Sequence, residues 1–552
     1  MQSSLETHEV VNQSPPFENV NLFAADMALA EAVAREGADW AGDALHLLGE
    51  AAGSAETIAL GRLANENPPK LRRYDQKGHR LDRVDFHPAY HELLALSFRE
   101  GLHCSTWEHG ASGAEPAQGG QVARAGRLYM IAQAEAGHMC PITMTHACVP
   151  ALRANAALLD RLAPKLLSRD YDPAFAPIET KRSMTIGMGM TEKQGGTDVR
   201  ANMTTALPLG ENGCYALAGH KWFMSAPMCD AFLVLAHTVN GLSCFFLPRF
   251  RSDGRPNAIR IERLKDKLGN RSNASSEVEF FNAEAELVGE EGRGVATIIE
   301  MVTLTRLDCA VASAGLMRLC LANALRHAKH RTVFQKRLID QPLMAQVLAD
   351  LALDSEAATA LAFRLAGSFD RQAQAEEAAF RRLMTPVIKY WVCKSAPAFA
   401  YEAMECLGGN GYVEEGLMAR AYREAPLNAI WEGSGNVMCL DILRVMQRDP
   451  EAVEAMLAFL APGVMGDARL TAALNGIKAM LTHPAGLEAQ ARRLAEQLAL
   501  LAAGALLRTH APAYVADVFI ASRLGGGWRQ TYGAGLSGAD HGAILARAGN
   551  GL

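Results

Sequence analysis

The chain has 552 residues, of which 49% are hydrophobic and 21% charged, so it can bury the cores of three or four structural domains. Its formal net charge of −6 excludes a global basic field that would recruit nucleic acid or membranes. The N-terminus lacks a basic and apolar targeting pattern, and the apolar run 494–507 is too short to span a bilayer. These features predict a cytoplasmic protein without a membrane segment.

Hydrophobic periodicity predicts an α+β protein that is mostly helical. Over residues 1–182 apolar residues recur at intervals of three and four, which predicts an all-helical N-terminal domain. Short β-type runs over 183–290 predict a central β-domain. The expected strands include Ala231–Ala236, Leu242–Leu247, Ala258–Ile261 and Glu277–Phe280.

Helical periodicity then resumes in long segments. A bundle is expected over 291–448, with helices near 295–333, 343–369 and 376–407. A helical extension over 449–552, for example at 487–508, completes the predicted domain organisation.

The cysteines favour reduced thiols. Eleven of them are scattered along the chain without a C-x-x-C spacing, which predicts no disulfide. Zinc ligation could be imagined at His138 with Cys140, or at His103 with Cys104. Neither pair has a second pair at a finger-like distance, so the sequence predicts buried side chains there and no metal site.

The segment MTEKQGGTDV, residues 190–199, has the chemistry of a cradle for an anion and a ring. Gly195 and Gly196 let the backbone approach a ligand closely, and the Thr197 hydroxyl can donate to a phosphate. Thr191 can face the polar edge of a heterocycle. Taken alone, the segment is equally an ordinary glycine-containing turn before a strand.

The segment IWEGSGN places Glu432 between an aromatic residue and a glycine. It forms a glycine-rich turn before an amphipathic helix over 437–445, and Asn436 is placed to cap that helix. Burial beside Trp431 would raise the carboxyl pKa toward neutrality, and proton abstraction next to a carbonyl needs such a base. A capping-region glutamate is the alternative, which the presence of both segments in this order disfavours.

Together with GHKWF, LKDKLGNRSNASSEVEF, RLANENPPKLRRYD and CPITMT, these segments resemble the acyl-CoA dehydrogenase superfamily of flavoproteins. EKQGGTD stands where typical members read EPGAGSD, which makes the chain most similar to the AidB branch of the adaptive response to alkylation. The resemblance implies an acyl-CoA dehydrogenase-like fold. That fold has N-terminal helices, a central β-domain and a C-terminal bundle, here with an extra C-terminal helical domain.

The resemblance also implies tightly bound, non-covalent FAD. In the superfamily the threonine-glutamate turn and the following strand contact the flavin and pyrophosphate, with a tryptophan usual where this chain has Phe223. The AMP half of FAD is held across a subunit boundary by an R-x-x-F pair and a glycine turn, which implies a homotetramer. The implied cofactor residues are Met190, Thr191, Gly196, Thr197, Trp222, Phe223, Met224, Ser225, Arg331, Phe334, Gly408, Gly409, Ile430, Trp431, Gly433 and Asn436.

By the same resemblance Glu432 is the catalytic base that removes the α-proton of an acyl thioester, whose carbonyl its own backbone N–H would polarise. Members that grip CoA commonly carry an acid three positions before the bundle arginine, whereas Thr303 precedes Arg306 here. The implied function is an AidB-like FAD-binding protein that binds double-stranded DNA and limits alkylation damage, with at most weak acyl-CoA dehydrogenase activity. The alternative is a metabolic dehydrogenase that oxidises a short or branched acyl-CoA.

The AidB branch credits its C-terminal domain with DNA binding. After residue 450 this chain has eight lysines and arginines against seven acidic residues, where a duplex-binding module would be more basic. A tail that packs on the bundle or on a neighbouring subunit is therefore an equal alternative. The candidate DNA contacts are Arg492, Arg493, Arg508, Arg523 and Arg529.

Overall fold

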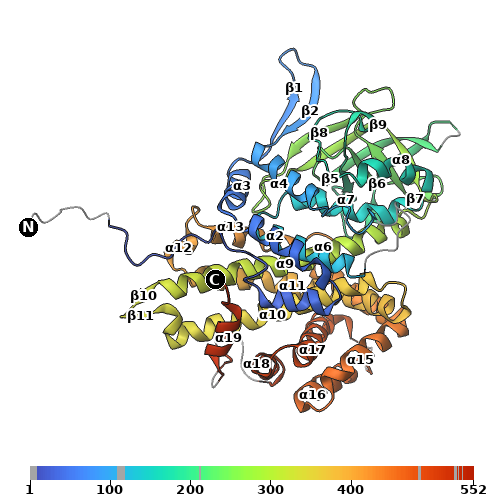
Figure 1. The fold of residues 1–552 in the computed structure, drawn as a ribbon. Helices are drawn as coiled ribbons and strands as arrows, with labels where there is room; N and C mark the ends of the chain where they lie inside the picture. The colour runs from blue at the N-terminus through green and yellow to red at the C-terminus, as the bar shows by residue number, and fades with distance from the viewer. Residues whose placement is uncertain are drawn as a thin grey trace, which may run out of the picture.

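A central β-domain sits against one side of a long helical bundle (Figure 1). The structure is a computed structural model, and it describes residues 9–108, 118–210, 213–482, 486–526, 531–532, 534–536 and 539–552. The order of elements confirms the predicted α+β, mostly helical fold class. Within the described ranges no helix combines the length and the apolarity needed to cross a membrane.

The N-terminal helices pack on the bundle through α6 and α7. Short polar side chains begin several of them: Asp26, Ser54 and Asn155 each accept a backbone N–H from the first turn of the helix that follows. The helices are α1 (Met27–Arg35), α2 (Gly42–Ala52), α3 (Ala55–Glu66), α4 (Pro88–Arg99), α6 (Gly120–Ala134), α7 (Met139–Leu152) and α8 (Ala156–Leu166).

The prediction that this region is entirely helical is wrong. A hairpin of two antiparallel strands, β1 (Lys70–Tyr74) and β2 (Arg80–Asp85), is inserted between α3 and α4. Asp75 shapes its turn by accepting the N–H groups of two residues in the turn. Arg80 then bonds Glu262 of the β-domain at 2.9 Å. The hairpin is stabilised by contacts with a distant strand, which local periodicity does not reveal.

The β-domain contains a seven-stranded sheet in which β7 pairs with both β9 and β6. As a result β6, β4, β5, β9 and β7 form a closed ring, with β3 and β8 attached to it. β6 is buried along most of its length, which explains its continuous apolar sequence. The strands are β3 (Ile186–Gly189), β4 (Thr205–Pro208), β5 (Cys214–Ser225), β6 (Ala231–Thr238), β7 (Gly241–Pro248), β8 (Ile259–Leu264) and β9 (Ser275–Val288), and they confirm all four of the predicted runs.

Three long helices, α9, α10 and α11, pack against one another to form the bundle core. The prediction for the first of them overran, because the chain leaves the helix at Arg331 and forms the hairpin β10 (Thr332–Val333) and β11 (Lys336–Arg337). Shorter helices lead from the bundle to the glycine-rich turn. The elements are α9 (Gly294–His330), α10 (Pro342–Asp370), α11 (Ala375–Glu405), α12 (Gly409–Tyr412), α13 (Leu417–Glu424) and α14 (Gly435–Arg448).

The C-terminal helices pack on the bundle. α17 contacts α10, α11 and α14 as well as its neighbours in the tail, and α19 contacts α10 and α1. The side chain of Arg523, on α18, is 0% exposed and pairs with Asp350 at 2.5 Å and Asp354 at 2.9 Å, both on α10. The helices are α15 (Pro450–Val464), α16 (Ala468–Leu481), α17 (Ala491–His510), α18 (Ala513–Leu524) and α19 (His541–Ala548).

Replacing Arg523 by alanine should destabilise the fold. The change removes a buried cation from its ion pairs with two buried carboxylates, and breaking such pairs typically costs about 3–5 kcal/mol. Thermal and denaturant unfolding of the FAD-loaded protein measures the loss. Arg493→Ala, an exposed position on α17, is the matched control and should stay within about 0.5 kcal/mol of the parent. Equal stability of Arg523→Ala and the parent would contradict the packing described for the tail.

Candidate functional site

Glu432 lies on a strained turn between the bundle and α14. Its backbone φ is +58°, in the left-handed region that non-glycine residues rarely adopt. Lys389 of α11 donates to the carbonyls on both sides of it, Trp431 O at 2.8 Å and Gly433 O at 2.5 Å. Arg306 of α9 donates to the Glu432 carbonyl at 2.9 Å. Two cations of the bundle thus fix the turn, and strain held this firmly is typical of functional sites.

The environment of the Glu432 carboxylate shifts its pKa. Burial raises its pKa above the ordinary value, although a hydrogen bond from Thr305 and the charges of Lys389 and Arg306 act in the opposite direction. The Thr305 hydroxyl donates to Oε2 at 2.6 Å and so orients the carboxylate. The predicted direction of the pKa shift is confirmed.

Cys140, at the start of α7, links this carboxylate to the β-domain. Burial raises the pKa of its thiol to about 12; the Lys267 charge acts in the opposite direction, the Glu432 charge raises the pKa further, and the nearby Asn273 and Ser225 side chains lower it. The thiol therefore lies within electrostatic reach of both Glu432 and Ser225, at the end of β5. The Oδ1 atom of Asn273 is buried without a hydrogen-bond partner among the described residues. An unsatisfied buried acceptor at this place fits a ligand with a polar edge.

The glycine-containing turn near the start of the β-domain, residues 190–199, is built on Glu192, a role that its motif alone does not indicate. Its carboxylate pairs with Lys221 at 2.7 Å and accepts the Thr204 hydroxyl at 2.6 Å and the Met203 N–H at 2.6 Å. Burial alone would raise its pKa, but Lys221 and these bonds outweigh it and lower the pKa to about 2. Glu192 and Lys221 each lie in one of the motifs quoted above, but their pairing becomes apparent only in the folded sheet.

The glycines of this turn have separate roles. A Cβ atom on Gly196 would lie 2.5 Å from the Thr191 hydroxyl, so the turn closes only with glycine there. A Cβ on Gly195 would meet nothing within 4 Å, so that side is open. The Trp222 N–H donates to the Thr191 carbonyl at 2.8 Å and brings the turn against β5. Thr197 is exposed beside the open side, and Met190 is half-buried.

The end of β5 presents an aromatic edge and a hydroxyl. Phe223 is 50% exposed, Met224 is buried, and the Ser225 hydroxyl lies 3.1 Å from that of Ser275. The Lys265 ammonium sits 3.4 Å from the ring centre of Trp222 and 4.6 Å from that of Phe223. An open glycine turn, an aromatic edge and an orphaned acceptor together fit the isoalloxazine and phosphate groups of FAD, whose chemistry is to accept a hydride.

The other implied cofactor residues lie elsewhere. Phe334 is 90% exposed at the tip of the hairpin β10–β11, at the end of the bundle away from the β-domain (Figure 1). Arg331 donates to the Asn12 carbonyl at 2.6 Å, and Cβ atoms on Gly408 and Gly409 would meet nothing within 4 Å. No described contact joins these groups to Glu432 within one chain.

Asn436 does not cap α14, contrary to the prediction. Ser434 is the residue before the helix, because Gly435 already has helical geometry. The Asn436 side chain instead accepts a hydrogen bond from Arg492 of α17 at 2.8 Å. The tail therefore reaches the turn that carries Glu432, where Ile430 is exposed.

Comparison with known proteins identifies the family. The chain matches models of the AidB adaptive response protein N-terminal domain over residues 12–173, the acyl-CoA dehydrogenase middle domain over 187–283 and the acyl-CoA dehydrogenase C-terminal domain over 292–447. It is 50% identical to AidB of Escherichia coli over 508 residues, covering 92% of each chain. The chain belongs to the AidB branch of the acyl-CoA dehydrogenase family.

More distant relatives agree. Acyl-CoA dehydrogenase family member 11 of Caenorhabditis elegans is 33% identical over 71% of this chain and 64% of its own length. The crystal structure of Caenorhabditis elegans ACDH-11 in complex with C11-CoA superposes with a TM-score of 0.85 at 28% identity, covering 94% and 93% of the two chains. As a family member, the chain is an FAD-dependent oxidoreductase of the class that acts on CH–CH groups.

His138 and His103, which were considered above as zinc ligands, are both buried among protein groups. His138 is buried, 2.8 Å from Glu135 and 2.9 Å from the Ser97 hydroxyl. The His103 ring contacts the Ser168 carbonyl at 3.0 Å and stacks on Phe98. Among the described residues, His, Cys, Asp and Glu form no cluster that could hold a metal ion.

The arginines expected to contact DNA differ in whether their side chains are free to reach a phosphate. Arg523 is buried in its ion pairs, so it cannot reach a phosphate, and this assignment is corrected. Arg508 donates to the Gly463 and Met465 carbonyls at 2.6 and 2.7 Å and serves as a cap for the end of α15. Arg493 is exposed, and Arg529 lies outside the described residues.

Replacing Glu192 by glutamine should weaken the β-domain in a pH-dependent way. The lowered pKa means that the charged form contributes stability above pH 4.5, and this contribution is lost as pH falls toward about 2. Hydrogen bonds to a charged group typically contribute about 1.5–3 kcal/mol. Thermal unfolding should therefore separate parent and variant most at neutral pH and least below pH 4. Exposed Glu279→Gln is the control, and a gap independent of pH would contradict the assignment.

Proposed function

We propose that this chain is an AidB-like FAD protein that associates with double-stranded DNA, limits alkylation damage and keeps a weak acyl-CoA dehydrogenase activity. The observation that carries the catalytic part is the turn of Glu432, held by Lys389 and Arg306 around a desolvated carboxylate. The similarity to Escherichia coli AidB over nearly the whole chain supports the rest.

In the proposed reaction Glu432 removes the α-proton of a thioester. Thr305 bonds one carboxylate oxygen, Oε2, which orients the other for the proton. The backbone N–H of Glu432 polarises the thioester carbonyl, and its direction is set by the cations on the turn. FAD supplies the acceptor for the β-hydride. A base whose pKa lies nearer the working pH balances proton affinity against availability.

The side chains one helical turn beyond Cys140 and Thr305 favour a short or branched acyl substrate. Thr143 on α7 and Asp308 on α9 lie one helical turn beyond Cys140 and Thr305, and they bond each other. Arg124 completes the cluster with two bonds of 2.7 Å to Asp308, and these two side chains are only 1% and 5% exposed. A long alkyl chain would have to lie against this buried ion pair, which provides no apolar wall.

The residues at the positions expected to bind CoA, Thr303 and Arg306, favour weak turnover of acyl-CoA. Thr303 stands where an acid is usual and donates instead to the Ile299 carbonyl of its own helix at 3.0 Å. Arg306 is committed to the Glu432 carbonyl and to Asp441 at 2.9 Å. Neither residue is therefore arranged primarily to hold a pantetheine arm.

An oligomer completes the proposed cofactor site. Phe334 has a φ of +50° and is exposed, so the hairpin presents it outward at a cost that an interface would offset. The open glycines at 408 and 409 lie at the end of α11, where a ligand or another backbone can approach closely. We therefore propose a homotetramer in which Arg331 and Phe334 hold the AMP half of a neighbour's FAD.

Glu432→Gln tests the catalytic proposal. The FAD-loaded variant should keep its cofactor and fold but lose thioester-dependent flavin reduction by about 10²–10⁴-fold. A panel of short, branched and long acyl-CoAs is added without oxygen while the flavin absorbance is followed. We expect slow bleaching by a short or branched member only. Unchanged rates in the variant would make Glu432 structural, and fast bleaching would favour the metabolic dehydrogenase.

Arg493→Ala tests the DNA proposal. If Arg493 contacts a phosphate, affinity for duplex DNA should fall and the dependence of log K on log salt should lose about 0.9 in slope. Because Arg508 and Arg523 are engaged inside the protein, we expect modest affinity overall. Arg161→Ala, on an exposed ion pair at the β-domain, is the control. Identical salt slopes for parent and Arg493→Ala would assign DNA binding to another surface.

A further inference from the structure

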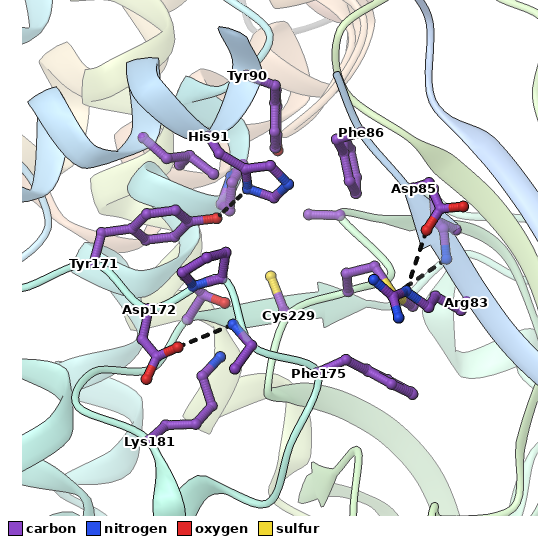
Figure 2. Close-up of a pocket in the computed structure, with 18 residues that line it drawn as sticks. Arg83, Asp85, Phe86, Tyr90, His91, Tyr171, Asp172, Phe175, Lys181 and Cys229 are labelled. Carbon is purple, nitrogen blue, oxygen red and sulfur yellow. Dashed lines mark hydrogen bonds and ion pairs between the residues drawn. The ribbon is translucent and has the colours of Figure 1, made fainter. Parts of the chain in front are cut away.

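A cavity of about 140 Å³ lies where hairpin β1–β2, the N-terminal helices and the β-domain meet (Figure 2). Its lining includes Ala226, Met228 and Cys229 from the loop that directly follows Ser225. Glu432 and the groups that hold its turn are not among the lining residues. The cavity therefore borders the flavin-side strand but is separate from the proposed site of proton abstraction.

Flat aromatic faces form one side of the cavity. Phe86 and Tyr90 stack with ring centres 4.3 Å apart and an angle of 13° between the rings. The His91 ring meets both of them edge-on, at 6.0 and 5.8 Å, and stacks with Tyr171 at 6.0 Å. Faces of this kind favour a planar ligand over a saturated one, because offset stacking and edge-to-face contacts need a ring.

The charged groups around the cavity already have partners. Arg83 pairs with Asp85 at 3.2 Å, and Lys181 pairs with Asp230 at 2.6 Å. Asp172 accepts the Ala174 N–H at 2.9 Å and the Arg182 N–H at 3.0 Å. An anionic or cationic ligand would have to disrupt one of these arrangements. The lining therefore favours a neutral molecule.

His91 offers one directed hydrogen bond to such a molecule. Its Nδ1 lies 2.8 Å from the Tyr171 hydroxyl, and Figure 2 shows the other ring nitrogen facing the middle of the cavity. Burial, and then the charge of Arg83, lower the pKa of His91, so the ring is neutral near pH 7. A neutral ring with one nitrogen engaged presents a single donor or acceptor to the cavity.

We propose that this cavity binds a neutral, planar aromatic or heteroaromatic molecule of about six to ten non-hydrogen atoms that hydrogen-bonds His91. The size follows from the volume, since a cavity of about 150 Å³ holds a benzene ring. The Cys229 thiol points into the same space (Figure 2). Because the loop behind Ser225 forms a wall, occupancy changes the surroundings of the flavin edge as well.

The cavity exists because of the hairpin. Its end, from Arg83 to Phe86, supplies lining residues, and the Val84 N–H contacts the Met228 sulfur at 3.3 Å across the domain boundary. Asp82 anchors the same strand by accepting the Ile261 N–H at 3.0 Å. The motif KLRRYD, which has no part in the flavin or base chemistry, begins this hairpin. The ligand site gives that segment a role.

Three small molecules test the proposal on the FAD-loaded full chain. Benzamide is planar and neutral, benzoate is planar and charged, and cyclohexanecarboxamide is neutral but saturated. Saturation-transfer NMR should show benzamide binding on the order of a millimolar or tighter, and the other two at least about tenfold more weakly. A small shift in the flavin absorbance should accompany benzamide alone. Absence of benzamide binding at about 10 mM, or equal binding of all three, overturns the proposal.

A matched pair of variants locates the site. His91→Phe keeps a flat ring but removes the nitrogen that faces the cavity, so benzamide should bind about tenfold more weakly. His79→Phe, an exposed ring in the turn of the same hairpin, should bind as the parent does. FAD content and thermal unfolding confirm that each variant is folded. Parent-like affinity in His91→Phe contradicts the site, and if that variant does not fold, the three-ligand comparison on the parent decides.

Discussion

Hydrogen bonds from buried cations to backbone carbonyls shape the site on which the proposed chemistry depends. Lys389 is only 1% exposed, and an ammonium buried to that extent must be hydrogen-bonded to be tolerated. The carbonyls of Trp431 and Gly433 meet that need, and the left-handed conformation at Glu432 aims them at the ammonium. The cation and the strained turn thus stabilise each other. Packing of α9 on α11 is what brings both cations to the turn.

The flavin side is built in the same way. Lys221 is buried, and it meets its requirements with Glu192 and the Leu235 carbonyl at 2.8 Å. This pair holds the glycine turn against β5, as Lys389 holds the other turn against the bundle. Cys140 lies within electrostatic reach of both Glu432 and Ser225. Each half of the site is therefore held by hydrogen bonds within the protein itself, an arrangement that suits the proposed preorganised chemistry.

The sequence predicted those elements whose signal is local. Both faces of β6 are buried and its sequence is continuously apolar, and the glycine-rich turn of Glu432 stands in one compact motif, so both elements can be predicted locally. The hairpin β1–β2 was missed because its strands are largely exposed and depend on Glu262, far away in the chain. The pairing of Glu192 with Lys221 was likewise invisible without the fold.

The count of charged residues in the C-terminal tail predicts least about how its arginines are oriented. The count could not show that Arg523 points into the bundle or that Arg492 bonds Asn436. The capping prediction for Asn436 failed because Gly435 had already entered the helix. In each case the orientation of a side chain was decided by tertiary packing, which composition does not encode.

The titration of the Glu432 carboxyl group tests the central claim most directly. Difference infrared spectroscopy of the FAD-loaded parent minus Glu432→Gln isolates its carboxyl band as pH is changed. We predict a midpoint above the ordinary glutamate value, since burial outweighs the nearby cations. In a Lys389→Met background the midpoint should rise further, because one of those cations is removed. A midpoint at or below the ordinary value, unchanged by Lys389→Met, would contradict a desolvated base held by the bundle.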